Sequence, residues 1–420
     1  MHTAVVHSSI CSIDGIKGEL RYRGYKIEDL VERCSYLEVA YLLIHGELPT
    51  RDQLEEWNSL CMGYSYVHED IKRITSSFRH DSHPMGFLVS SCSALGTFYG
   101  ESNPALQGRD IYKKNPHLVN QQIYRVLGKL PTLAAFAYRH RAGRSYNDPT
   151  TGEEALRLGY SGNFLSMLDR LDEKDYRPHP VIANAMEKLF IIHAEHGMNA
   201  STTAVRHVSS CGSDLWTCIA SGCAALYGPS HGGANQAVLD MLINDVRTVE
   251  NIPSFLDRVK RKETVLYGFG HRAYKNFDPR AGLIRDIATD VFDVCGYNSL
   301  VDLAEKLAEA ALKDEYFVSR KLYPNVDFWS GLIYDQIGFP RDMFPVLFAL
   351  GRVAGWLAHW KESLNDPEEK IYRPTQIYQG AQPRDFLTLS RRQASANPPN
   401  LKPLSTSGGK VKKRRLLSKL

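Results

Sequence analysis

The chain lacks any run of about 18 apolar residues, any clear excess of one charge sign and any closely paired cysteines. The first absence argues against a transmembrane helix. Because 51 Lys and Arg face 47 Asp and Glu, the net charge of +4 gives no indication of nucleic-acid binding outside the C-terminal tail. The N-terminus has neither the basic and apolar regions of a signal peptide nor the Arg-rich pattern of a transit peptide. We expect a globular protein that binds neither membranes nor nucleic acid.

The cysteines are scattered rather than paired. There are eight, none of them in a Cys-x-x-Cys motif, and several lie among small and apolar residues, as in Trp216–Leu226. This setting is typical of reduced thiols that pack as small hydrophobic side chains in a reducing compartment. We expect neither a disulfide framework nor a zinc site, and we expect most of the eight thiols to be buried.

Alternating Val-rich segments are almost absent, and apolar residues recur at helical spacing through most of the 420 residues. The exception is Ser12–Gly24, whose turns and short extended pieces predict a small β-hairpin. From Arg391 onward Ser, Pro, Asn and Lys replace large apolar residues, which predicts a disordered tail. The sequence therefore predicts an all-α fold with a minor hairpin near the N-terminus, and its length allows two domains.

The segment Gly268–Arg280 (GFGHRAYKNFDPR) places a histidine and an arginine close together in the sequence. His271 follows a Gly-Phe-Gly loop, and Arg280 comes nine residues later. Glycines at 268 and 270 allow backbone to approach a ligand without a Cβ in the way. The segment therefore combines a proton-transfer group with an anion-binding group. The alternative is a surface turn with a solvated histidine.

Two other segments carry candidate acid–base groups. His231 precedes a helix predicted to begin near Ala234, and a helix N-terminus favours neutral imidazole, which can donate a hydrogen bond to an enolate oxygen. The alternative is a histidine satisfied within its loop. Asp327 lies between Val326 and Phe328, where poor solvation should raise its pKa and suit it as a general base. It could also be the N-cap of the following helix.

The remaining candidates are histidines and arginines. His193 and His196 are three apart, so they would share a helix face. The alternatives there are metal binding, contact with substrate and buried structural histidines. Arg352 lies in an otherwise apolar helix, and an arginine there needs an anionic partner. Arg373 precedes a proline. With Arg280, these are three arginines that could each form an ordinary salt bridge. Together with three histidines and an aspartate they indicate a pocket for a small dicarboxylate.

Six segments, in order, together resemble the citrate synthase family from Ser8 to about Phe386. The resemblance implies an acyltransferase that condenses acetyl-CoA with oxaloacetate and hydrolyses citryl-CoA to citrate and CoA. Alternatives are a 2-methylcitrate synthase that uses propionyl-CoA and a homologue without catalysis. The segments, which look closest to bacterial-type enzymes of peroxisomes or glyoxysomes, are SSICSIDGIKGELRYRGY, HAEHGMNASTTAVRH, LYGPSHGGANQAV, GFGHRAYKNFDPRAG, DEYFVSRKLYPNVDFWSGLIY and RPTQIYQG.

The resemblance also implies the residue roles. His231 would hydrogen-bond the acetyl-CoA carbonyl, Asp327 would remove a methyl proton and His271 would protonate the ketone of oxaloacetate. No metal and no tightly bound cofactor is expected. The implied oxaloacetate ligands are His196, His271, Arg280, Arg352 and Arg373, the last from the partner subunit of a homodimer. The implied CoA contacts are Val265, Leu266, Tyr267, Gly268, Phe269 and Gly270, with Lys275 at a phosphate.

By the same resemblance, the fold has a large domain of residues 1–232 and 339–385 and a small mobile domain of residues 233–338. Residues 386–420 form the tail, which ends in Ser418-Lys419-Leu420. This tripeptide is a peroxisomal address read by the import receptor. We therefore expect a peroxisomal or glyoxysomal enzyme, with the cytoplasm as the alternative.

Overall fold

The computed structural model describes residues 6–392 except 172, 174, 272, 273, 275–277, 297, 298 and 369. The described residues up to Tyr372 form one compact unit, and those from Arg373 onward belong to a second. Residues 373–392 are exposed and irregular except for the short 3-10 helix η5 (Leu389–Arg391). The remainder of the predicted tail, including Ser418-Lys419-Leu420, lies outside the described residues.

A small antiparallel sheet near the N-terminus confirms the predicted hairpin and adds a third strand. Its order is β1 (Cys11–Asp14), β2 (Glu19–Tyr22) and β3 (Tyr25–Lys26), with Ile13 opposite Leu20. Asp14 makes the first turn, because its carboxylate accepts the backbone N–H groups of Ile16 and Lys17 at 3.0 Å each. Local side-chain to backbone bonds of this kind favour turns.

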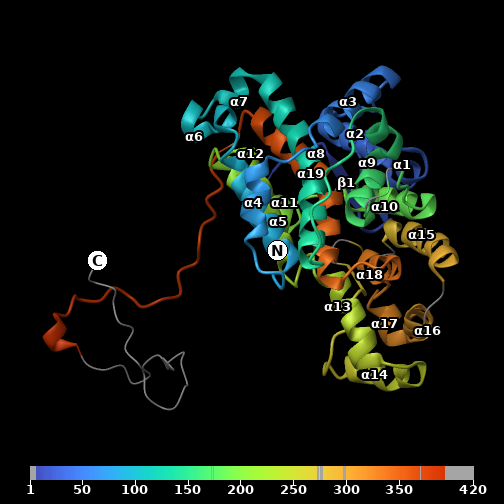
Figure 1. Ribbon diagram of the computed structural model, residues 1–420. Helices are drawn as coiled ribbons and strands as arrows, with labels where there is room; N and C mark the ends of the chain where they lie inside the picture. Colours follow the sequence, from blue (N-terminus) through green and yellow to red (C-terminus); the bar gives the residue numbers. More distant parts are fainter. Residues whose placement is uncertain are drawn as a thin grey trace, which may run out of the picture. The chain divides into compact units, whose positions relative to one another are not determined.

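Helices form most of the first unit, which confirms the predicted all-α class (Figure 1). The first half contains α1 (Ile27–Arg33), α2 (Tyr36–His45), α3 (Arg51–Gly63), α4 (Glu69–Ser76), α5 (Pro84–Gly96), η1 (Gly100–Ser102), α6 (Pro104–Gln107), α7 (Ile111–Lys114), α8 (Pro116–Arg141), α9 (Gly152–Asp169) and α10 (Pro180–His193). The second half contains α11 (Ala200–Ser210), α12 (Leu215–Tyr227), α13 (Ala234–Asp240), the π-helix η2 (Met241–Val246), η3 (Val249–Asn251), α14 (Ile252–Lys260), α15 (Pro279–Cys295), α16 (Ser299–Lys313), α17 (Glu315–Ser319), α18 (Val326–Ile337), η4 (Arg341–Met343) and α19 (Phe344–Asn365). Among the described helices, none is both long and apolar enough to span a membrane.

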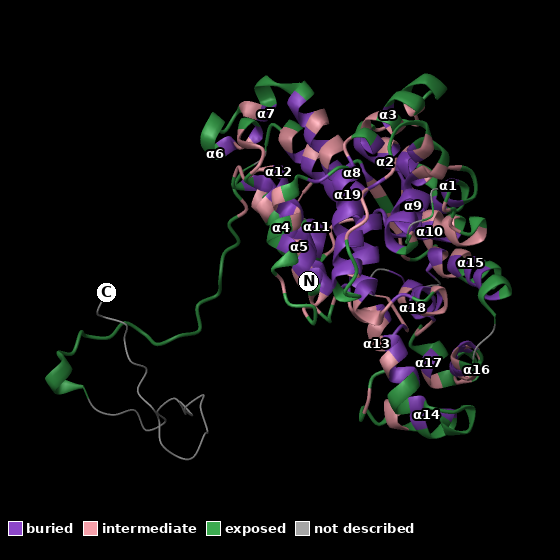
Figure 2. Ribbon diagram, viewed as in Figure 1, coloured by how far each residue is buried: buried purple, intermediate pink, exposed green. Residues whose placement is uncertain are grey.

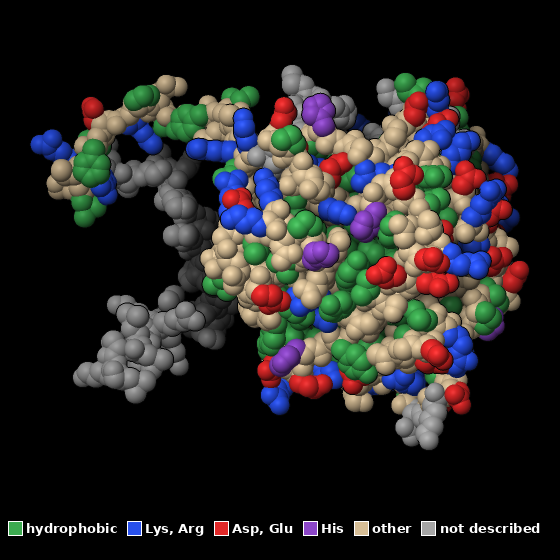
Figure 3. All heavy atoms as spheres, turned by 90° about the horizontal axis from the view of Figure 1, so that it is seen from above, with side chains coloured by type: hydrophobic (Ala, Val, Ile, Leu, Met, Phe, Trp, Pro, Cys, Tyr) green, Lys and Arg blue, Asp and Glu red, His purple; other side chains and the backbone are tan. Residues whose placement is uncertain are grey.

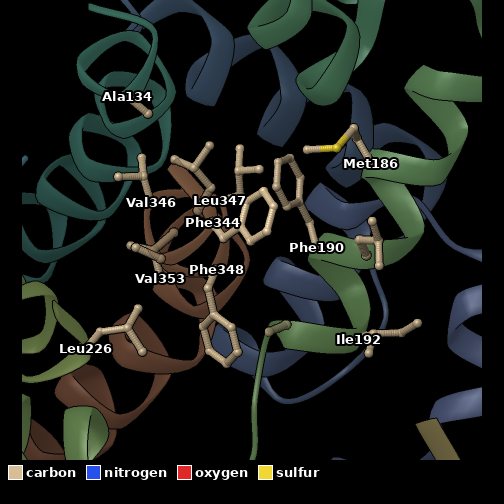
Figure 4. Packing of buried hydrophobic residues seen from close by; sticks show 14 of the residues in the cluster. Ala134, Met186, Phe190, Ile192, Leu226, Phe344, Val346, Leu347, Phe348 and Val353 are labelled. Carbon is tan, nitrogen blue, oxygen red and sulfur yellow. The ribbon is translucent and has the colours of Figure 1, made fainter. Parts of the chain in front are cut away.

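Helix α19 is the centre of the core. Nearly all its side chains are buried, as expected for a helix that is apolar on every face (Figure 2). It packs against α2, α8, α10, α11 and α12. Figure 4 shows the packing of Phe344 and Phe348 of α19 near Phe190 of α10. This arrangement holds the buried Arg352 of α19 in a fixed position.

A second group of helices follows α12. Helix α18 packs against α13 and α15, and α15 also packs against α1 and α10 (Figure 1). The contacts place α13–α18 in the same compact unit as the earlier helices. The expected division into residues 1–232 with 339–385 and residues 233–338 therefore stays a prediction.

The thiols and the surface complete the description. All eight cysteines are free, but only Cys61, Cys92, Cys218 and Cys223 are buried. Our expectation that most would be buried was wrong, because Cys11 and Cys34 are only half-buried and Cys211 and Cys295 are exposed at the C-terminal ends of α11 and α15. On the face shown in Figure 3, acidic and basic side chains of the first unit are mixed.

Candidate active site

One pocket of about 810 Å³ brings together most of the predicted site residues. Among the residues that line it are His196, His231, His271, Arg280, Asp327 and Arg352, six of the seven predicted catalytic and oxaloacetate-binding residues. They come from separate parts of the chain: His196 follows α10, His231 precedes α13, His271 and Arg280 lie before and at the start of α15, and Asp327 and Arg352 lie in α18 and α19. Arg373 is exposed and belongs to the second unit, and Lys275 lies outside the described residues.

Asp327 lies in the first turn of α18, but it is not the N-cap. Asn325 has that role, because its side-chain oxygen accepts the backbone N–H of Asp327 at 2.9 Å. The Asp327 carboxylate is therefore free to face the pocket. Burial raises its pKa to about 6, and Arg280 opposes this shift. The carboxylate is thus a stronger base than an aspartate in water.

The Gly-Phe-Gly loop fixes the position of His271 relative to Asp327. Gly270 N–H donates to Tyr323 O, and Asn325 N–H donates to Gly268 O, both at 2.8 Å. Gly268 has φ +78°, and a Cβ there would lie 2.7 Å from Val238 and 2.9 Å from Phe328. Gly268 therefore allows the loop to pack against α13 and α18, and a Cβ on Gly270 would lie 2.8 Å from Leu322. The close approach of this backbone to a ligand stays a prediction.

His231 is held by a hydrogen-bond network that defines its tautomer. The backbone N–H of Ser201 donates to His231 Nε2 at 3.3 Å, and the Ser201 hydroxyl is 3.0 Å from the same atom. Trp356 Nε1–H in turn donates to the hydroxyl of Ser201 at 3.2 Å. A backbone N–H can only donate, so Nε2 is the acceptor and the proton of the neutral ring is on Nδ1.

Burial keeps this ring neutral. It lowers the pKa of His231 to about 4, and Arg352 adds to the effect. Helix α13 does begin at Ala234, as predicted, but it has only 7 residues. Burial and the neighbouring arginine lower the pKa of His231, and a contribution from the helix N-terminus stays a prediction.

His196 and His271 form an aromatic cluster with Tyr274. The two imidazole centroids are 4.9 Å apart, and the Tyr274 hydroxyl lies 3.1 Å from His196 Nε2. Burial and Arg280 lower the pKa of His271 to about 4. Burial, Arg280 and His271 likewise hold the pKa of His196 well below its usual value. All three pocket histidines are therefore neutral at physiological pH.

His193 and His196 do not share a helix face. Helix α10 ends at His193, whose Nδ1 is 2.7 Å from the carbonyl of Leu189, and His196 lies in the following turn. The described residues contain no cluster of three or more histidines, cysteines or acidic side chains suited to a metal. The spacing-based suggestion of a shared metal is thus not matched by the geometry.

The two pocket arginines are buried and differently paired. Arg280 forms a two-point ion pair with Asp278, with Nε–Oδ1 at 2.9 Å and Nη2–Oδ2 at 2.7 Å. Arg352 donates from Nε to the carbonyl of His193 at 2.6 Å, and its guanidinium lies over the Phe348 ring. Asp278 balances the charge of Arg280, and Arg352 adds a second buried positive charge that favours an anionic ligand.

Sequence reasoning missed Asn325, Ser201 and Tyr274. Asn325 was detectable as an N-cap residue one position before Val326. Tyr274 lies inside the Gly268–Arg280 segment, but no spacing rule links it to His196. Ser201 reaches His231 only through the packing of α11 on α12. Contacts between distant segments of this kind carry no local sequence signal.

The sequence of this chain matches a family model and several known proteins. A family model described as "Citrate synthase, C-terminal domain" matches residues 1–375. The chain is 57% identical over 391 residues to "Citrate synthase, peroxisomal" of Dictyostelium discoideum, covering 93% of this chain and 78% of the relative. It is 50% identical over 416 residues to "Citrate synthase, glyoxysomal" of Cucurbita maxima, covering 99% and 79%.

Solved structures agree with these sequence matches. The citrate synthase of Pyrobaculum aerophilum superposes with a TM-score of 0.83 at 32% identity, covering 93% of each chain. The enzyme of Thermoplasma acidophilum, solved as a ternary complex with carboxymethyl coenzyme A and oxaloacetate, gives a TM-score of 0.82 at 26% identity. That match covers 93% of this chain and 97% of the other.

Proposed function

The chain belongs to the citrate synthase family, and we propose that the pocket around Asp327 is where it condenses acetyl-CoA with oxaloacetate. The activity is that of a citrate synthase, in which citryl-CoA is then hydrolysed to citrate and CoA. The main support for this site is that the Asp327 carboxylate shares one pocket with the neutral side chains of His231 and His271. Burial raises the pKa of Asp327 to about 6.

In this proposal Asp327 is the general base. The methyl group of acetyl-CoA is a weak carbon acid, so its deprotonation needs a base stronger than an ordinary carboxylate. With a pKa near 6 the carboxylate is still mostly ionised at pH 7, and it can both accept and return a proton. The electron pair of the broken C–H bond moves toward the thioester oxygen as Asp327 takes the proton.

His231 stabilises that oxygen. Its Nε2 is occupied by Ser201, so its Nδ1–H is the donor available to an oxygen in the pocket. A donor already oriented before the reaction stabilises charge that develops in the transition state, at no cost of reorganisation. The nucleophilic carbon then attacks the ketone carbon of oxaloacetate, and His271 gives the ketone oxygen its proton. Water finally cleaves the thioester.

The arginines and His196 bind the oxaloacetate carboxylates in this proposal. Arg280 and Arg352 are both buried at the pocket, where charge-assisted hydrogen bonds are strong. Arg373 would come from the partner subunit of a homodimer. The backbone of Val265–Gly270 and Lys275 would contact CoA, by resemblance to the family.

The proposed chemistry needs only these side chains, so we infer that neither a metal nor a bound cofactor takes part. Dialysis against EDTA should then leave the turnover rate unchanged, and a rate restored only by an added divalent cation would contradict this.

The C-terminal Ser418-Lys419-Leu420 supports a peroxisomal location, as do relatives named peroxisomal and glyoxysomal. Deleting the tripeptide should leave activity intact and move a fluorescent fusion to the cytoplasm. A fusion that stays in peroxisomes would show that another signal is used.

The test of the site compares Asp327→Asn with Asp335→Asn. Asp335 lies two turns further along α18 and also has a raised pKa, but it is not among the pocket residues. CoA release from acetyl-CoA plus oxaloacetate should fall by about 10²–10⁴-fold in Asp327→Asn and little in Asp335→Asn. CoA release from propionyl-CoA, measured in the same assay, shows whether the protein prefers acetyl-CoA or acts as a 2-methylcitrate synthase. Near-normal turnover in folded Asp327→Asn would remove Asp327 as the base.

A further inference from the structure

The turn after α10 sends two neighbouring side chains in opposite directions. His196 lines the pocket, whereas Glu195 is fully buried beneath it. The Glu195 carboxylate accepts the backbone N–H of Gly197 at 2.5 Å, and the same oxygen, Oε1, is 3.1 Å from His359 Nε2. The Glu195 carboxylate therefore connects the residues before and after His196 to His359 of α19.

Helix α19 is shaped to receive this turn. Gly355 N–H donates to the carbonyl of Ala194 at 3.1 Å. A Cβ on Gly355 would collide with that carbonyl and with Glu195 Oε2. A Cβ on Gly351, one turn earlier, would lie 2.9 Å from the carbonyl of Phe190. Two glycines that flank Arg352 thus bring the turn and the arginine together.

A chain of polar side chains behind Glu195 fixes its charge environment. His359 Nδ1 is 3.4 Å from Arg206 Nη1, and the same guanidinium nitrogen is 3.0 Å from Glu362 Oε2. A guanidinium can only donate, so His359 accepts at Nδ1 and donates its Nε2–H to Glu195. Arg206 thus contacts Glu362 directly and reaches Glu195 through the His359 ring.

Arg352 is a buried cation bonded to the same turn, because its Nε donates to a carbonyl there. Burial lowers the pKa of Arg352, and among the influences that oppose this shift the charge of Glu195 is the largest. A buried arginine without a countercharge is costly, so the charge of Glu195 favours the charged form of Arg352.

We propose that Glu195 is a positioning residue of the oxaloacetate site, which fixes the turn carrying His196 and balances the charge of Arg352. The proposal rests on the assignment of His196 and Arg352 as oxaloacetate ligands. Glu195 itself does not line the pocket, so it acts through these two residues.

The test compares Glu195→Gln with Glu187→Gln. Glu187 is a matched control, because it is also a carboxylate that accepts a backbone N–H, from Tyr36 at 2.7 Å, but it does not line the pocket. Glu195→Gln should raise the KM for oxaloacetate about tenfold and leave the KM for acetyl-CoA within about twofold. Glu187→Gln should change neither KM.

The direction of the change separates positioning from simple repulsion. If Glu195 acted only as a negative charge near a dianion, its removal would lower the KM for oxaloacetate. A lowered or unchanged KM in the folded variant would therefore overturn the proposal. If Glu195→Gln does not fold, Glu195→Asp keeps the charge but withdraws the carboxylate from Gly197, and the same rise in KM is expected.

Titration calorimetry with oxaloacetate alone provides a readout that needs no turnover. Weaker oxaloacetate binding in Glu195→Gln than in wild type supports the positioning role even if catalysis is lost. Equal binding in the two proteins contradicts it. By contrast, a folded wild type that releases no CoA would contradict the proposed active site. The comparison of oxaloacetate binding between wild type and Glu195→Gln would still test the role of Glu195.

Discussion

At the residue scale, the pocket gives its ionisable side chains charge states suited to a condensation. Burial raises the pKa of Asp327 to about 6 and lowers those of His231 and His271 to about 4. Near neutral pH the base is therefore ionised but still basic, while both imidazoles are neutral donors. One physical cause, the poor solvation of charge, produces both effects.

The pH profile follows from these values. Because Asp327 must be deprotonated to act, kcat/KM for acetyl-CoA should fall as the pH drops through about 6. The histidines titrate near 4 and should not contribute above pH 5. Steady-state rates between about pH 5 and 8 test this. As a control, Asp335→Asn should show the same fall in kcat/KM at low pH. A wild-type profile that is flat over this range would contradict the assignment of Asp327 as the base.

Tyr274 offers a residue-scale test of the histidine cluster. Tyr274→Phe removes the hydroxyl 3.1 Å from His196 Nε2, and loss of one such hydrogen bond costs about 1 kcal/mol. The KM for oxaloacetate should rise about fivefold, since 1.4 kcal/mol corresponds to about tenfold. Tyr146→Phe is the control, because its hydroxyl lies 3.4 Å from His140 Nδ1 away from the pocket. Equal effects of the two variants would argue against a role for Tyr274.

At the element scale, the contact between the loop at residues 268–270 and residues 323–325 matters because it fixes His271 relative to Asp327. Backbone hydrogen bonds connect the Gly-Phe-Gly loop to the residues that lead into α18. Asn325 strengthens the link, because its side-chain amide donates to the carbonyl of Gly270 at 2.9 Å. His271 and Asp327 thus stay in register although they are far apart in the sequence.

Gly268→Ala should break this register. The residue has φ +78°, and its Cβ would meet Val238 and Phe328 within 3 Å. We expect a loss of about 1–3 kcal/mol of folding free energy together with a lower kcat, measured by denaturant unfolding and CoA release. Gly282→Ala, in α15, is the control, because nothing lies within 4 Å of its added Cβ. It should stabilise the fold by about 0.5–1 kcal/mol. Unchanged kcat in Gly268→Ala would show that the loop tolerates a shift.

The elements were largely predictable, and the contacts between them were not. Helical periodicity depends on nearby residues, so the all-α class and the start of α13 at Ala234 were predicted correctly. Asn325 and Asp327 are both good N-cap residues two positions apart, so sequence alone could not choose between them. His193 and His196 have helical spacing, but α10 ends between them because the turn docks on Gly355. That docking depends on α19, which lies more than 150 residues further along the chain.

At the scale of the whole molecule, the central expectation is that two chains build each active site. The first unit supplies six candidate residues to one pocket, and Arg373 belongs to the second unit. If the partner subunit contributes Arg373, each pocket combines Asp327 of one chain with Arg373 of the other. Arginine at such a place would complete the binding of a dicarboxylate.

Mixing two inactive variants tests this directly. In a dimer of Arg373→Ala with Asp327→Ala, one of the two pockets keeps both residues if Arg373 acts on the partner. Random reassociation should therefore restore about a quarter of the wild-type activity, because about half of the dimers are mixed. Arg373→Ala mixed with wild type controls for exchange of subunits. No recovery after proven exchange would place Arg373 in its own chain's pocket.

The two exposed thiols have a practical consequence. Cys211 follows the last residue of α11, and Cys295 is the last residue of α15. They therefore lie in different members of the expected pair of domains, the large one and the small one of residues 233–338. Nitroxide spin labels on these two natural cysteines would report the separation of the two expected domains, here called lobes, without any engineered site. Pulsed electron resonance with and without oxaloacetate would then show a shorter label separation if the lobes close, and an unchanged one if they move as a single body.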